Sequence, residues 1–111
     1  IMGDEKYFGK VPSECHVEDA NKAARLAVIT RLAVIKSELG SLDQVARVIS
    51  VSGFVNAAPD FTDHPQVVNG ASDLLVEIFG EIGKHSRTAV GCSSLPLGVA
   101  VEVSLVVEVK S

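Results

Sequence analysis

Aromatic residues are scarce in this 111-residue sequence: tryptophan is absent, tyrosine occurs once, and aromatics make up 5% of the chain. Proteins that bind single-stranded nucleic acid stack its bases on aromatic side chains, so few stacking platforms are available. Basic residues are also few, since 10 Lys and Arg oppose 14 Asp and Glu and the net charge is −4. We therefore do not expect a nucleic-acid partner.

Cysteine is nearly absent too, with Cys15 and Cys92 far apart and no C-x-x-C motif. A small secreted scaffold held by disulfides would need more cysteines, so we interpret both as reduced thiols of a cytoplasmic protein. The opening IMGDEKYFGK carries charges where a signal peptide has an apolar run. No apolar run reaches the ~18 residues of a membrane span, and we expect no membrane segment.

Small apolar residues recur at helical spacing between residues 17 and 39, and they predict a long helix. The stripe consists of Ala20, Ala23, Ala24, Ala27 and Leu32. A second helix is predicted with Asp63 or His64 as its cap, because Pro65 suits the first helical position. This helix ends in the glycine-containing segment GEIGKH.

Three strands are predicted at residues 45–55, 86–92 and 99–110 from their β-branched residues and alternation. The order helix, strand, helix, strand, strand predicts an α+β fold in one domain, residues 1–111, with two helices covering one sheet face. The other face, where Glu102 points, mixes polar and apolar residues. Such a half-covered face favours association with other copies of the chain.

The segment HSRTAVG, residues 85–91, places Arg87 among small and apolar residues. A guanidinium is a planar fork that holds a carboxylate through two parallel hydrogen bonds, so Arg87 is a candidate ligand for a small acid. The alternative is an exposed or ion-paired strand arginine. Glu102 is the second candidate, because a carboxylate in a valine-rich strand could face a cleft and orient water. Its alternatives are a solvated glutamate or the ion-pair partner of Arg87.

Other polar residues give weaker signals. His16, His64 and His85 lack metal-ligand spacing and lie near predicted helix ends, so a capping or exposed role is expected and no metal is predicted. The pair Asn69–Gly70 is unfavourable inside a helix and marks either a packing contact or a functional amide. The dispersed glycines form neither a dinucleotide fingerprint nor a phosphate-binding loop.

Three segments together resemble the RidA/YjgF family: AARLAVITRLAVIKSELGSLDQVARVISVSGFVNAAPDF, NGASDLLVEIFGEIGKHSRTAVG and LPLGVAVEVSLVVEV. The resemblance runs from about Gly9 to Val109, and its most specific parts are the arginine strand, the Leu-Pro turn and the Val-Glu-Val strand. It implies a chorismate-mutase-like fold, in which one mixed sheet packs on two helices. It also implies a homotrimer with a barrel-like centre and ligand clefts between subunits.

The best-known members of this family hydrolyse reactive 2-imino acids to 2-oxo acids and ammonia, without a metal or organic cofactor. The resemblance therefore implies a small carboxylate as ligand and no cofactor. By motif, Arg87 matches the arginine that binds the substrate carboxylate, and Ala89 falls where a cysteine backbone N–H often contacts the same group. Glu102 matches the glutamate that places the attacking water, and Asn69 matches a helix asparagine near the cleft.

Two departures from the family pattern stand out. Full-length members begin with a strand pair that has no match here, so we expect a domain lacking that pair, either because the sequence is a fragment or because its N-terminus is shortened. The segment GFVNAAPDFTDHPQVVNGASDLL is typical of a divergent branch. Two alternative functions therefore stay open: a trimer that binds a small carboxylate without turnover, and, less expected, the endoribonuclease of the older family name.

Overall fold

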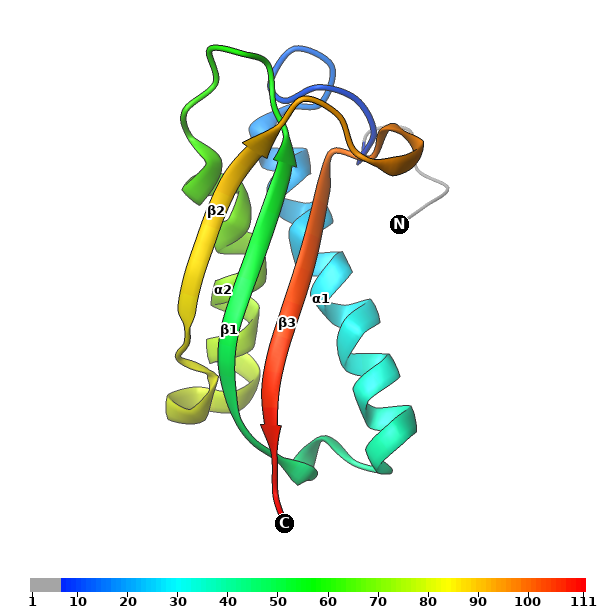
Figure 1. Cartoon of the computed structure of the whole chain (residues 1–111), viewed down its shortest axis with the longest axis vertical. Coiled ribbons are helices and arrows are strands. Elements are labelled where there is room, and N and C mark those ends of the chain that lie inside the picture. Colours follow the sequence, from blue (N-terminus) through cyan, green and yellow to red (C-terminus); the bar gives the residue numbers. More distant parts are fainter. Residues whose placement is uncertain (1–6) are drawn as a thin grey trace.

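The computed structural model describes residues 7–111, and residues 1–6, part of the charged opening IMGDEKYFGK, lie outside the described part. Its helices and strands are α1 (Val17–Leu39), β1 (Val45–Asn56), α2 (His64–Phe79), β2 (Ser86–Cys92) and β3 (Val101–Val109) (Figure 1). Short 3-10 helices lie at Leu42–Gln44, Gly80–Gly83 and Pro96–Gly98. The predicted order of elements and the α+β class are confirmed.

The long helix α1 has the predicted bounds. Its buried residues form one apolar stripe at helical spacing: Ala20, Ala23, Ala24, Val28 and Leu32. Beyond the last turn, Gly40 adopts a left-handed conformation with φ of 85°, and its N–H donates to the carbonyl of Lys36 at 2.7 Å. Glycine takes this conformation without steric cost, so it ends the helix where the sequence indicates.

Helix α2 begins at the predicted position, with Asp63 at the N-cap and Pro65 in the first turn. It packs closely on α1 at Gly70, where an added Cβ would lie only 2.0 Å from the carbonyl oxygen of Asn21. The side-chain amide of Asn21 donates to the carbonyl of Gln66 at 2.8 Å and joins the two helices at the same place. The packing explanation for this glycine is therefore confirmed.

The sheet has the order β2-β1-β3, with β1 parallel to β2 and antiparallel to β3. Both helices lie on one face of this mixed sheet (Figure 1). Helix α2 connects the two parallel strands, so the start of β2 lies beside α2. That connection places the candidate arginine next to the helix that carries the candidate asparagine.

The two faces of the sheet differ as predicted. Val101 and Val103 are buried toward the helices, whereas Glu102 between them is exposed on the open face. Val90 and Val106 also lie on the open face, with 40% and 50% of their surfaces exposed. A sheet covered on one side only therefore presents a mixed polar and apolar surface.

The segment before α1 lies against the end of β1 and the residues that precede β3. The N–H of Val11 donates to the carbonyl of Asn56 at 2.8 Å, and Phe8 forms an isolated antiparallel bridge with Val99. This pairing of Val99 with the early segment explains why β3 begins two residues later than predicted. No helix in residues 7–111 is long and apolar enough to cross a bilayer.

Candidate functional site

Arg87 is the second residue of β2, and its side chain is exposed. Its Nη1 donates to Oδ1 of Asn69 at 2.6 Å and to Oγ of Ser72 at 3.4 Å. Both partners are uncharged, and the ion pairs found among residues 7–111 do not include Arg87. The ion-paired alternative is therefore wrong within this part of the chain, whereas the alternative of an exposed strand arginine agrees with the structure.

Local structure explains how these side chains meet. Asn69 and Ser72 are three residues apart on α2 and so project from the same helix face. On β2, Arg87 pairs in parallel register with the buried residue Val51, which directs it to the helix-covered side of the sheet. The structure thus brings together two of the residues that the family resemblance singled out, Asn69 and Arg87.

A histidine extends the same cluster. His85 Nε2 lies 2.9 Å from Oγ of Ser72, and its Nδ1 lies 2.6 Å from the carbonyl oxygen of Gly83. A hollow of about 270 Å³ opens here, lined by Ser72, Asp73, Val76, Lys84, His85 and Arg87. Sequence reasoning missed Ser72 and treated His85 as a helix-end residue. Two spacings in the sequence could have indicated these residues. Ser72 lies three residues after Asn69 and so shares its helix face, and His85 lies two residues before Arg87.

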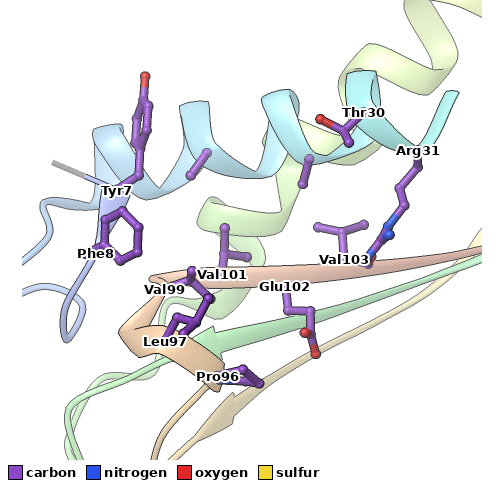
Figure 2. A pocket seen from close by; sticks show the side chains of 12 residues that line it. Tyr7, Phe8, Thr30, Arg31, Pro96, Leu97, Val99, Val101, Glu102 and Val103 are labelled. Atoms are coloured by element: carbon purple, nitrogen blue, oxygen red, sulfur yellow. The ribbon is translucent and has the colours of Figure 1, made fainter. Parts of the chain in front are cut away.

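Glu102 does not join this cluster. It pairs with Phe54 on β1, which separates its strand from β2, and it projects from the open face. Figure 2 shows its carboxylate pointing away from α1, whereas Val103 beside it points toward the helix. Within one chain, Arg87 and Glu102 therefore lie on opposite sides of the sheet, and the proposed ion pair between them is wrong.

A second, more apolar hollow lies between α1 and β3 (Figure 2). It has a volume of about 270 Å³, and Arg31 and Glu102 provide its charged groups. Arg31 Nε donates to the carbonyl of Val103 at 3.3 Å, along the outer edge of β3. The structure thus places Glu102 in the same hollow as Arg31, whereas Arg87 lines a different hollow.

Ala89 lies two residues after Arg87 on β2, opposite Gly53 of β1, and packs partly against the core. In residues 7–111, β2 is an edge strand, and alternate N–H groups of an edge strand lack a strand partner. Its predicted contact with a carboxylate stays a prediction. The described residues include no group of three or more His, Cys, Asp or Glu side chains that could hold a metal ion.

Comparison with known proteins decides the family. Residues 1–109 match the family model described as "YjgF/chorismate mutase-like, putative endoribonuclease". The chain belongs to the YjgF family. This confirms the family predicted from the arginine strand, the Leu-Pro turn and the Val-Glu-Val strand.

Solved structures share the YjgF fold of this chain. A protein of unknown function from Agrobacterium tumefaciens is 40% identical, with a TM-score of 0.91, over 94% of this chain and 67% of that one. A protein from Shewanella oneidensis named a "putative endoribonuclease" is 33% identical, with a TM-score of 0.91, over 98% of this chain and 72% of that one. The chorismate-mutase-like fold is therefore confirmed.

A curated relative, Protein TCP17 of Trypanosoma cruzi, is 41% identical over 104 residues, which are 93% of this chain. The YjgF chain described here spans 65% of the length of TCP17.

Proposed function

We propose that the chain hydrolyses reactive 2-imino acids to 2-oxo acids and ammonia. The observation that carries this proposal is the state of Arg87: its guanidinium is exposed, and its hydrogen-bond partners on α2 are neutral. Asn69 accepts a hydrogen bond from Nη1 of the Arg87 guanidinium, and because Asn69 is neutral it does not compensate the positive charge. A small carboxylate is the group that such a fork binds with fixed orientation.

In this reaction, the substrate carboxylate binds Arg87, with the backbone N–H of Ala89 as a further donor. Water attacks the imine carbon and ammonia leaves, so positioning and acid–base assistance are the main requirements. Glu102 can take part only if a second copy supplies it, because in its own chain it faces the opposite side of the sheet. The proposal therefore includes a homotrimer whose open sheet faces meet and whose clefts lie between subunits.

A small-carboxylate binder without turnover is the second candidate. The separation of Arg87 from Glu102 within one chain favours it, since anion binding needs only the arginine. Endoribonuclease is the name given to the family and to the Shewanella relative. In this chain, the net charge of −4 and the scarcity of aromatic residues give RNA little to bind.

The test uses an amino-acid dehydratase that generates a 2-imino acid, with formation of the 2-oxo acid followed over time. Replacing Arg87→Ala removes a charge-assisted fork, and kcat/KM should fall roughly 100-fold, equivalent to about 3 kcal/mol. The control is Arg25→Ala, which removes an exposed ion pair with Glu77 at 3.3 Å and should leave turnover unchanged.

Wild-type turnover in Arg87→Ala would contradict the assignment of this site. Binding of a 2-oxo acid without acceleration of imine hydrolysis in the unaltered protein would favour the second candidate.

A further inference from the structure

The hydrogen bonds around His85 have one possible direction when its ring is neutral. The Gly83 carbonyl can only accept, so Nδ1 carries the ring hydrogen at their 2.6 Å contact. Nε2 is then the acceptor, and the Ser72 hydroxyl donates to it across 2.9 Å. Arg87 Nη1 approaches the same Ser72 oxygen at 3.4 Å. A continuous chain of hydrogen bonds therefore leads from His85 through Ser72 to Arg87.

The backbone holds His85 in this orientation. Gly83 is buried, and an added Cβ would lie 2.3 Å from the carbonyl oxygen of Leu75, so the turn packs directly on the α2 backbone. The carbonyl oxygen of Gly83 is therefore held in a fixed position beside the imidazole ring of His85. This arrangement also stabilises the charged imidazolium, because Nδ1–H remains bonded when Nε2 takes up a proton.

Other charged groups around the hollow are poorly suited to proton transfer near neutral pH. Asp73 comes from α2, Arg87 from β2, and Lys84 from the turn, where its ammonium pairs with Glu81 at 2.8 Å. Carboxylates, ammonium and guanidinium groups change charge far from neutrality in ordinary surroundings, whereas histidine changes charge close to it. His85 is thus the group of this cluster suited to exchange a proton with a ligand on Arg87.

We propose that Ser72 and His85 form the proton-transfer pair of the Arg87 site, an inference that rests on the proposed function. Ser72 Oγ accepts a proton from the attacking water while its own hydrogen passes to His85 Nε2, and the water oxygen bonds to the imine carbon. The proton then returns through Ser72 to the nitrogen of the tetrahedral intermediate. Because the substrate enters as the protonated imine, this nitrogen is then an ammonium leaving group. The hydroxyl proton of the intermediate passes through Ser72 to His85 as the C–N bond breaks and the carbonyl of the 2-oxo acid forms. His85 gives this proton to the departing ammonia and is neutral again at the end.

The first test measures the neighbourhood of His85 without turnover. The ring signals of the three histidines are followed by NMR against pH, with and without pyruvate, and His85→Gln assigns the signal. An anion on Arg87 should raise the titration midpoint of His85 by roughly 0.5–1 unit, because it favours the imidazolium. The signals of His16 and His64 serve as internal controls and should not move. An unchanged midpoint of His85 at saturating pyruvate overturns the inference, even if imine hydrolysis is observed.

The second test separates proton transfer from structural support. His85→Gln and Ser72→Ala should each lower kcat about 100-fold while KM stays within about twofold. In contrast, Arg87→Lys should raise KM. The acidic limb of the kcat–pH profile should disappear in His85→Gln and persist in the control His64→Gln, whose ring lies 5.3 Å from that of Phe61 in a different hollow.

These measurements distinguish a failure of the proton-transfer pair from a failure of the proposed imine hydrolysis. A raised His85 midpoint in a protein that does not accelerate imine hydrolysis supports the proton-exchange site and refutes the proposed reaction. Imine hydrolysis that depends on Arg87 but keeps its kcat and pH profile in His85→Gln refutes the inference and leaves the proposed function standing.

Discussion

At the scale of single residues, the two cysteines have different surroundings. Cys15 is buried before α1, and burial, with a smaller contribution from the negative charge of Asp19, raises the pKa of its thiol. Cys92 ends β2 and is half-buried in the hollow that also contains His64. Because the thiolate is the reactive form, the two thiols should differ in reactivity.

We expect a thiol reagent such as a disulfide dye to react in two phases at pH 8 under native conditions. The fast phase should belong to Cys92, and the slow phase to Cys15, which needs local opening before it can react. Cys92→Ser should remove the fast phase and leave the slow one. A fast phase that persists in Cys92→Ser would show that Cys15 is reached directly.

Single residues also show a limit of sequence reasoning. Arg87 could be selected as a lone guanidinium in a strand and Asn69 through the family resemblance, but Ser72, which is 15 residues from Arg87 in the chain, was missed. His85 meets Ser72 only because the turn after α2 folds back on the helix.

At the scale of elements, the contact between α1 and α2 depends on the absence of a side chain. Gly70 faces the backbone of Asn21, and Gly53 of β1 faces Val68 of α2, where an added Cβ would lie 2.4 Å from Cγ2. The first contact is backbone against backbone and cannot relax by rotation of a side chain. Close packing of this kind fixes the position of α2 and therefore of Asn69.

Gly70→Ala should destabilise the chain by about 3 kcal/mol, because the new methyl group forces the two helices apart. A fall in Tm on the order of 10 °C, measured by circular dichroism, corresponds to this change. Val76→Ala is the matched control on α2, since Val76 is 37% exposed and its truncation should cost less than about 1 kcal/mol. Equal Tm values for Gly70→Ala and the unaltered chain would contradict the contact.

At the scale of the whole molecule, the open face of the sheet is the surface that neither helix covers. Its exposed residues combine Val90 and Val106 with Glu102 and Ser104, so it is neither a solvated face nor a core face. The proposed trimer would cover the apolar residues and bring Glu102 of one copy toward another. The trimer and the cytoplasmic location both stay predictions.

Val106→Glu tests the trimer, because it places a charge on the open sheet face that is proposed to be buried. Light scattering coupled to gel filtration should give three times the 11.7 kDa chain mass for the unaltered protein and a smaller assembly for the variant. Ile29→Glu is the control, since Ile29 is 46% exposed on α1 and does not line the hollows between α1 and β3. A monomer in the unaltered protein would exclude a cleft shared between subunits.

The amino-acid sequence by itself determined the elements and their order. Periodicity, Pro65 and the glycines after the helices act locally, so α1, α2, β1 and β2 fall close to their predicted bounds. The resemblance to the YjgF family could also be recognised from the sequence, because it depends on contiguous strand and turn motifs.

Only the tertiary structure decided which polar groups meet. The parallel pairing of β1 with β2 and the crossover through α2 bring Asn69, Ser72 and His85 to Arg87, and they leave Glu102 on the other face. The physical reason is that side chains of adjacent residues on a strand point to opposite faces, while contacts across elements depend on register and helix packing. No local pattern in the chain encodes the strand register or the packing of the helices.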